Sequence, residues 1–152
     1  MINNTESKYS VLIFEDDFTL ATEWKDVLTE IGFDVEHSWD VKDALNLCEQ
    51  IKFDIIICDI FIKDNYGQLK AHAGINLILR MRRQPDGPLS WGRDVPILVV
   101  TGASIALGPV VHDNIKNMKT SMFLRKPFTT SQLVEKIQEI ISELESKEND
   151  HA

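Results

Sequence analysis

Short apolar runs alternate with segments of helical periodicity along most of the chain. The runs are short enough for strands, and they cover residues 11–14, 33–37, 53–59, 95–100 and 121–125. Between and after them, apolar residues recur every three or four positions within residues 20–31, 41–48, 75–79, 111–118 and 133–144, which predicts helices. This strict alternation indicates an α/β fold: a doubly wound, five-stranded parallel sheet with right-handed crossovers and helices on both faces.

The third apolar run is the axis of the predicted sheet. Ile55, Ile56 and Ile57 are consecutive β-branched residues, which favour a strand, and a strand without polar positions has to be covered on both faces. We therefore place this strand at the centre. It ends in Asp59, at the carboxyl edge of the sheet, where open α/β proteins bind their ligands.

Local signals mark the ends of the helices. Gly32 follows the first helix at a position that favours left-handed backbone, and Asp17 can cap the start of that helix. Thr129 and Gln132 have the spacing of a capping box before the last helix. The polar ends lead us to expect a flexible N-terminus over residues 1–8, one domain over residues 9–145 and a flexible C-terminal tail over residues 146–152.

Length and charge narrow the possible functions. A chain of 152 residues fits one domain, in which about 70% of the unfolded surface becomes buried, so we expect no second, output domain. Its 16 basic and 24 acidic residues leave a net charge of -8, which disfavours nucleic acid and anionic membranes as partners. Without a signal peptide, a membrane-length apolar run or metal-like cysteine spacing, we expect a cytoplasmic protein.

Polar side chains stand at the carboxyl ends of four predicted strands. Glu15 and Asp16 follow the first strand, Asp59 ends the third, Thr101 follows the fourth and Lys126 follows the fifth. Because parallel strands share one carboxyl edge, we expect these side chains to meet. Three carboxylates repel one another and a hard cation relieves the repulsion, so we predict Mg²⁺ at an open site. Lys126 and Thr101 offer a positive charge and a hydroxyl group to phosphoryl oxygens.

Asp59 is the predicted nucleophile of this site. A carboxylate can take up a phosphoryl group as an acyl phosphate when nearby positive charge neutralises both partners. Asp59 lies on the central strand, between the acidic pair on one side and Thr101 and Lys126 on the other, so it can face both.

With these residues in this order, the chain resembles a response-regulator receiver domain of bacterial two-component signalling. The matching features are the acidic pair Glu15-Asp16, Asp59 and Thr101 at the ends of apolar runs, and the motif Lys126-Pro127-Phe128. The resemblance covers residues 9–145. It implies a flavodoxin-like sheet with strand order 2-1-3-4-5 and the site at the switch between strands one and three.

The resemblance also implies a role for each residue. A histidine kinase or a phosphotransfer protein would donate the phosphoryl group to Asp59, and the protein would be a phosphoacceptor, not an enzyme. Asp16, Asp59 and the backbone carbonyl of Phe61 would bind Mg²⁺ directly, and Glu15 would bind it through water. The phosphate-binding and switch residues would be Thr101, Gly102, Lys126 and Phe123, with a cis peptide bond before Pro127. A downstream protein, or a second copy in a homodimer, would contact the face of the fourth helix, fifth strand and fifth helix.

Several features depart from the family pattern. Residues 60–73 are several residues longer than the usual turn after the phosphoacceptor, and we consider a lid or a partner-binding loop for them. Residues 84–94 and 101–109 also form long loops. Phe61 and Ala103 occupy the two positions that tune phosphoryl lifetime in the family, and neither can orient water, so we hypothesise slow autodephosphorylation. Phe123 stands where tyrosine is common and cannot donate a hydrogen bond.

Three other functions compete with this interpretation. A phosphatase of the haloacid-dehalogenase type needs a second aspartate two places after the nucleophile, where Phe61 stands. A flavin binder would need a Ser/Thr-rich phosphate loop in place of the acidic pair. A pseudo-receiver, which binds partners without phosphorylation, is favoured by the altered loops and opposed by the complete set of strand-end residues.

We interpret the histidines His37, His72, His112 and His151 as solvated or loop residues, and Trp24, Trp39 and Trp91 as packing residues.

Overall fold

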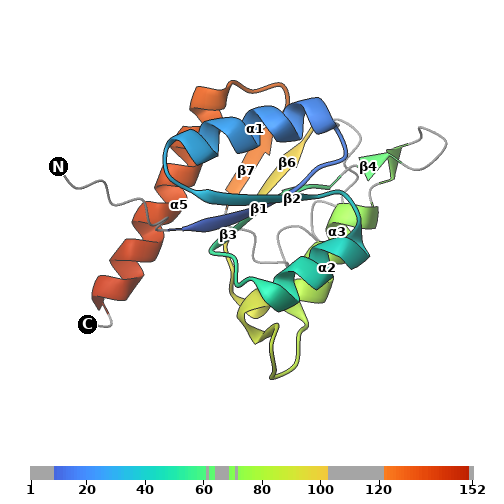
Figure 1. Cartoon of the computed structure of the whole chain (residues 1–152). Helices are drawn as coiled ribbons and strands as arrows, with labels where there is room; N and C mark the ends of the chain where they lie inside the picture. Colours follow the sequence, from blue (N-terminus) through green and yellow to red (C-terminus); the bar gives the residue numbers. More distant parts are fainter. Residues whose placement is uncertain (1–8, 61, 64–68, 71, 103–121, 151–152) are drawn as a thin grey trace.

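Five parallel strands form the central sheet of the computed structural model, which describes residues 9–60, 62–63, 69–70, 72–102 and 122–150 (Figure 1). The strands are β1 (Ser10–Phe14), β2 (Asp34–Ser38), β3 (Ile55–Asp59), β6 (Ile97–Thr101) and β7 (Met122–Arg125). Their lateral order is β2-β1-β3-β6-β7, and each neighbouring pair is parallel. Numbered among themselves, they have the order 2-1-3-4-5, so the predicted flavodoxin-like fold is confirmed.

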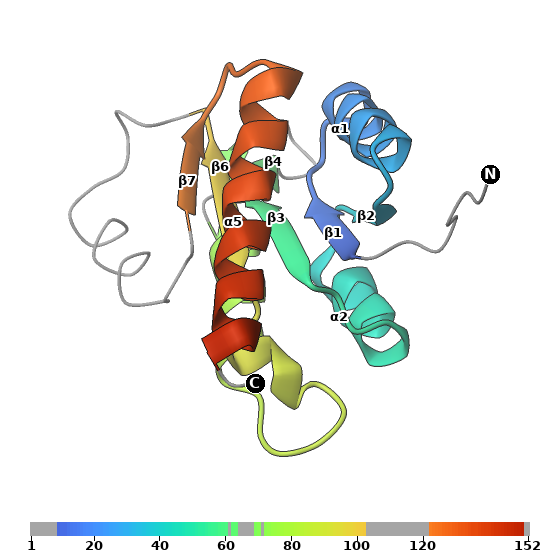
Figure 2. The same cartoon turned by 90° about the vertical axis from the view of Figure 1, so that its left-hand side faces the viewer.

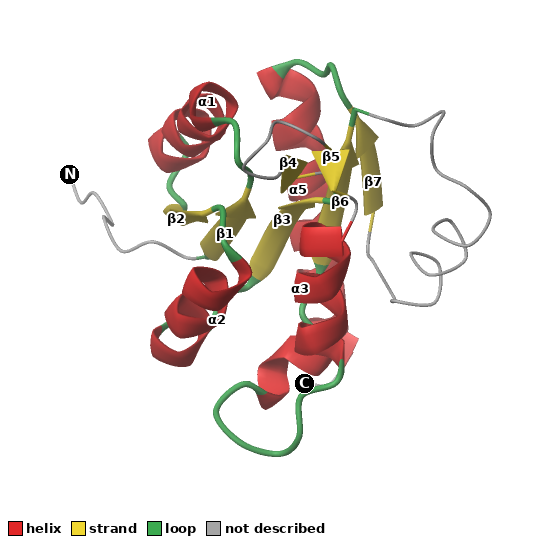
Figure 3. Ribbon diagram, turned by 90° about the vertical axis from the view of Figure 1, so that its right-hand side faces the viewer, coloured by secondary structure: helices red, strands yellow, loops and turns green. Residues whose placement is uncertain are grey.

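Within the described residues, two helices cover each face of the sheet (Figures 2 and 3). Helices α1 (Phe18–Glu30) and α5 (Thr130–Asp150) pack on one face, and α2 (Val41–Gln50) and α3 (His72–Arg82) pack on the other. None of these helices is both long enough and apolar enough to cross a membrane.

The two faces of the sheet form two separate parts of the core. Successive side chains of a strand point to opposite faces, so Leu12 and Phe14 pack with α2 and α3, while Val11 and Ile13 pack with α1 and α5. Every residue of β3 is buried, as expected for a central strand covered on both sides. The isoleucine run therefore holds the end of β3 in a rigid position.

Side-chain caps fix where the helices start. The Asp17 carboxylate accepts a hydrogen bond of 3.1 Å from the backbone N–H of Leu20 at the start of α1. At the start of α5, the Gln132 N–H donates to the Thr129 hydroxyl at 3.1 Å, and the Thr129 N–H donates to the Gln132 side chain at 2.8 Å. Both predicted caps are confirmed, and they set the direction in which the chain leaves the carboxyl edge of the sheet.

The C-terminal segment differs from the prediction. Helix α5 continues to Asp150, so residues 146–150 are helical and extend the helix beyond its predicted end near Leu144. Flexibility of residues 146–152 stays a prediction. These residues carry no apolar stripe, but serine, lysine, glutamate and asparagine are tolerated in a helix that has already formed. The expected flexible N-terminus, residues 1–8, lies outside the described residues.

The long connection after Asp59 contains structure that the sequence analysis did not predict. Two short antiparallel strands, β4 (Ile62–Lys63) and β5 (Leu69–Lys70), pair within it before α3 begins. The second long loop contains a 3-10 helix, η1 (Ser90–Arg93). The helix expected over residues 111–118 and the loop over residues 103–109 lie outside the described residues.

Helix α3 starts in direct contact with the end of β3. A Cβ atom added to Gly74 would lie 2.2 Å from the carbonyl oxygen of Asp59 and 2.5 Å from the Cα atom of Ile60. The missing side chain therefore allows the first turn of α3 to rest on the backbone that carries Asp59.

Candidate functional site

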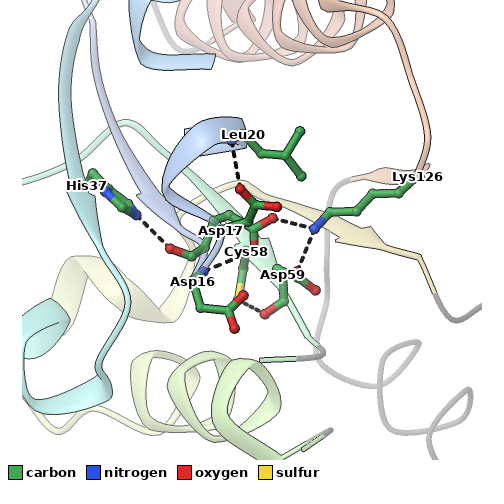
Figure 4. Close-up of polar contacts among 8 residues, drawn as sticks. Asp16, Asp17, Leu20, His37, Cys58, Asp59 and Lys126 are labelled. Atoms are coloured by element: carbon green, nitrogen blue, oxygen red, sulfur yellow. Dashed lines mark hydrogen bonds and ion pairs between the residues drawn. The ribbon is translucent and has the colours of Figure 1, made fainter. Parts of the chain in front are cut away.

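Three carboxylates meet at the carboxyl edge of the sheet (Figure 4). Glu15 and Asp16 directly follow β1, and Asp59 is the last residue of β3. Phe14 of β1 is paired with Cys58 of β3, so the two strand ends lie side by side. One oxygen from each of Glu15, Asp16 and Asp59 lies within 4.8 Å of the others. Because these are hard oxygen donors in an acidic cluster, they fit a divalent cation such as Mg²⁺.

Burial increases the repulsion between the carboxylates. Glu15 is 0% exposed and Asp59 is 3% exposed, while Asp16 is half-buried. Low-dielectric surroundings screen charges poorly, so negative charge here has to be balanced by a proton, an ammonium group or a metal ion.

Lys126 supplies the ammonium group. It follows β7, and its Nζ atom donates to Asp59 Oδ2 at 2.8 Å and also to Glu15 Oε1. Its backbone N–H donates to the carbonyl oxygen of Thr101 at 2.8 Å, which ties the chain after β7 to the end of β6. The Lys126–Pro127 peptide bond is cis, as the resemblance implied.

The pKa values follow from this arrangement. Desolvation, together with the hydrogen bond and negative charge of Asp59, raises the pKa of Glu15 from 4.5 to about 8, although Lys126 acts in the opposite direction. Burial lowers the pKa of Lys126, but its contacts with Asp59 and Glu15 outweigh that effect, and the pKa is raised overall. Lys126 therefore stays charged, and Glu15 releases its proton less readily than an exposed glutamate does.

Thr101 and Gly102 lie at the same edge of the sheet. Thr101 is the last residue of β6, is fully buried and is paired with Arg125 of β7. A Cβ atom added to Gly102 would be 3.6 Å from Lys126 Cβ, so Gly102 lies against the lysine side chain. Glu15, Asp16, Asp59 and Lys126 are therefore close in space, and Thr101 is joined to them through the backbone of Lys126.

Of the expected site residues, Phe123 lies away from this cluster, and Phe61 is not described. The expected metal ligand, the backbone carbonyl of Phe61, belongs to a residue outside the described ranges. Phe123 is on β7 and is 40% exposed.

His37 was wrongly interpreted as a solvated or loop residue. It lies in β2, is half-buried, and its Nε2 atom is 2.6 Å from the carbonyl oxygen of Glu15 (Figure 4). A carbonyl only accepts hydrogen bonds, so Nε2 carries the proton and donates it. The alternation of apolar and polar residues predicted the strand β2, but such a pattern does not reveal that His37 contacts the residue that follows the neighbouring strand β1.

Two exposed aromatic rings lie next to His37. Phe18 is 55% exposed and Trp39 is 49% exposed, and their ring centroids are 4.9 Å apart. Trp39 therefore packs on neighbouring rings at the surface and not in the core, whereas Trp24 is 3% exposed and belongs to the core, as predicted. Phe18 and Trp39 form an apolar surface beside the acidic cluster.

The sheet order and this polar edge together define a class of protein. A parallel sheet of this topology, with an acidic cluster and a lysine at its carboxyl edge, is the arrangement of the receiver domains of two-component signalling. The chain belongs to that family, because the family model described as the response regulator receiver domain matches residues 11–138.

Comparison with known proteins gives relatives that are longer than this chain. The "Probable transcriptional regulator ycf29" of Cyanophora paradoxa is 28% identical over 135 residues, which cover 88% of this chain and 56% of that protein. The "Probable transcriptional regulatory protein SilR" of Salmonella typhimurium is 29% identical over 133 residues, which cover 86% of this chain and 50% of that protein. The chain thus spans about half the length of these curated relatives.

A solved structure shares the fold. The CheY-like receiver domain protein of Methanospirillum hungatei JF-1 superposes with a TM-score of 0.73 at 22% identity, and the match covers 93% of this chain and 99% of that one.

Proposed function

We propose that Asp59 accepts a phosphoryl group from a histidine kinase or a histidine phosphotransfer protein, and that the phosphorylated protein signals through protein–protein contacts. The observation that carries this proposal is the contact of the Lys126 ammonium with Asp59 Oδ2, at 2.8 Å, beside the carboxylates of Glu15 and Asp16. A nucleophilic carboxylate, a cation beside it and an acidic metal-binding cluster are the parts that an acyl phosphate requires.

The transfer uses the residues of this chain as follows. An oxygen of the Asp59 carboxylate attacks the phosphorus, and the bond from phosphorus to the imidazole nitrogen of the donor breaks, with its electron pair left on that nitrogen. Lys126 neutralises negative charge on the transferred oxygens, and the Thr101 hydroxyl, at the end of β6, would donate a hydrogen bond to one of them. The product is an acyl phosphate on Asp59.

Glu15, Asp16 and Asp59 would hold Mg²⁺, since their oxygens form one cluster at the site. A bound Mg²⁺ would offset the charge of the carboxylates and of the incoming phosphoryl group. The backbone carbonyl of Phe61, which the resemblance adds as a ligand, lies outside the described residues.

Slow autodephosphorylation is part of the proposal. Its support is the apolar side chain at both lifetime positions, Phe61 and Ala103, which lie outside the described residues. We expect Phe61→Asn to accelerate decay of the acyl phosphate, because an amide can orient water. Decay at an equal rate in wild type and Phe61→Asn would contradict this part alone.

The readout of the signal is also proposed, on the basis of the family resemblance. Phe123 is exposed on β7, and with α5 it belongs to the face that a downstream protein, or a second copy of the chain, would contact. Phosphorylation would shift the population of Phe123 orientations and so change this face.

Function without an attached output domain stays a prediction, which the mass of the native protein in cell extracts would test.

Mass spectrometry tests the central proposal. The protein is incubated with Mg²⁺ and acetyl phosphate, beside the variants Asp59→Asn and Asp17→Asn. Asp17 lies in the same acidic run, and asparagine caps a helix as well as aspartate does, so Asp17→Asn is a matched control.

Wild type and Asp17→Asn should gain the mass of one phosphoryl group, which hydroxylamine removes, and Asp59→Asn should gain none. Modification of Asp59→Asn to the same extent would overturn the assignment of Asp59. No modification of any form, by acetyl phosphate or by phosphohistidine donors, would favour the pseudo-receiver.

A further inference from the structure

A buried indole ring lies against the lysine of the site. Trp24 is on α1, is 3% exposed and packs in the core between the sheet, α1 and α5. The Nζ atom of Lys126 lies 5.6 Å from the centroid of the Trp24 ring, within the range of a cation–π interaction, and tryptophan is the best ring for it.

The same ring is held by the segment that carries the lysine. Phe128 comes two residues after Lys126, and its ring stacks on Trp24 with centroids 5.3 Å apart and planes inclined by 25°. Trp24 therefore contacts the segment after β7 at two points, once through the ammonium and once through Phe128. Since Trp24 is buried, it has little freedom to move away from either contact.

The indole and the carboxylates hold the ammonium in different ways. Glu15 and Asp59 bind Lys126 through ion pairs, and an ammonium committed to Glu15 has less positive charge to offer to a phosphoryl group. An aromatic face attracts the ammonium without neutralising it or occupying its N–H donors in a particular direction. The ammonium can thus turn from Glu15 toward new oxygens while its contact with the ring persists.

We propose that Trp24 is a positioning residue for Lys126: it keeps the ammonium at the mouth of the site while the ammonium exchanges one oxygen partner for another. This inference rests on the proposed function of Asp59 and Lys126. It assigns to α1 an indirect part in phosphoryl binding, through a side chain that touches neither metal nor phosphoryl group and acts on Lys126.

The first test needs neither metal nor phosphate. Lysine side chains are labelled with ¹³C, and the ε-methylene resonance of Lys126 is assigned by its loss in Lys126→Arg. The ring current of Trp24 should displace this resonance upfield of the other lysines, and Trp24→Leu should return it to their range. Trp24→Phe should give an intermediate position. An unchanged Lys126 resonance in Trp24→Leu would show that the ring does not hold the lysine.

The second test separates positioning from packing by a double-mutant cycle. Affinity for beryllofluoride, an analogue of the phosphoryl group, is measured in the presence of Mg²⁺ for wild type, Trp24→Leu, Lys126→Ala and the double variant, and Mg²⁺ affinity is measured separately. We expect Trp24→Leu to weaken beryllofluoride binding about fivefold with Mg²⁺ affinity unchanged, as befits a cation–π contact. In the Lys126→Ala background the same substitution should have no effect, because the partner is gone.

Equal losses in both backgrounds would mean that Trp24 only fills the core, and the proposal would be wrong. Trp24→Phe keeps an aromatic face and should retain most of the beryllofluoride affinity. This variant therefore tests the proposal even if Trp24→Leu folds poorly. Failure of Asp59 phosphorylation in wild type would overturn the proposed function, while the resonance of Lys126 would still decide whether Trp24 holds the lysine.

Discussion

Replacing Gly74 with alanine should destabilise the protein, although helix propensity predicts the opposite. Gly74 lies inside α3, where alanine is favoured over glycine by about 1 kcal/mol in an exposed helix. Here the new Cβ atom would lie 2.2 Å from the Asp59 carbonyl oxygen, 2.5 Å from Ile60 Cα and 2.9 Å from the Asp59 carbonyl carbon. All three are backbone atoms, so no side chain can rotate away.

The expected magnitude follows from these distances. To reach ordinary contact, α3 and the end of β3 have to separate by about 1 Å, given that carbon atoms pack about 3.5 Å apart. Overpacking of this kind costs about 1–3 kcal/mol, and a clash with backbone belongs at the upper end. Against the gain in helix propensity, we expect a net loss of about 2 kcal/mol in the free energy of unfolding.

Urea unfolding measures this loss. With a slope of about 2 kcal/mol per molar urea, the midpoint should fall by about 1 M. Asn76→Ala is the matched control, because Asn76 is exposed on the same helix and its replacement should change stability by less than about 0.5 kcal/mol. The displaced backbone carries Asp59, so phosphorylation of Gly74→Ala should also slow. A midpoint equal to or above that of wild type would refute the reasoning.

Three further predictions concern charge, capping and thiol reactivity. In EDTA, the pKa of Glu15 rises from 4.5 in the unfolded chain to about 8 on folding. The folded protein binds the extra proton, so the stability that Glu15 contributes is fully present below pH 4.5 and is lost as the pH rises to about 8. Glu15→Gln should remove this part of the pH dependence in urea titrations, and equal slopes in the two proteins would contradict the assignment. Thr129→Ala should lower the free energy of unfolding by about 1 kcal/mol, because it removes the hydroxyl that caps α5. Thr129→Ser keeps a hydroxyl and should retain most of this stability, so equal losses in the two variants would argue against capping. Burial raises the pKa of the Cys48 thiol to about 12, and burial with the charges of Asp59 and Glu15 raises that of Cys58 well above its usual range. Both thiols should therefore react with a disulfide reagent at pH 8 only as fast as the protein opens, and rapid labelling would contradict their burial.

The polar edge was predictable because parallel topology carries its own geometry. Once Glu15, Asp59 and Lys126 are assigned to strand ends, the sheet brings them together without knowledge of any side-chain contact. The caps of α1 and α5 were predictable for a similar reason, since they depend on residues three positions apart.

Other features were missed because no local pattern encodes them. The strands β4 and β5 have two residues each, too few for an alternation to be visible. The last turns of α5 lack an apolar stripe, which was the signal used to predict helices. His37 and Trp24 look like ordinary residues of a strand and a helix, and only their neighbours distinguish them.

The order of strands and helices, the identity of the strand-end residues and therefore the kind of chemistry that this edge can support all follow from the linear pattern of residues. The reason is that periodicity, capping and strand ends depend on neighbours within a few positions of the chain. Three contacts become visible only in the folded molecule: Lys126 bridges Glu15 and Asp59, Trp24 lies against the same ammonium, and Gly74 rests on the Asp59 backbone. Those contacts join elements far apart in the chain, and their distances depend on how all of the helices pack on the sheet.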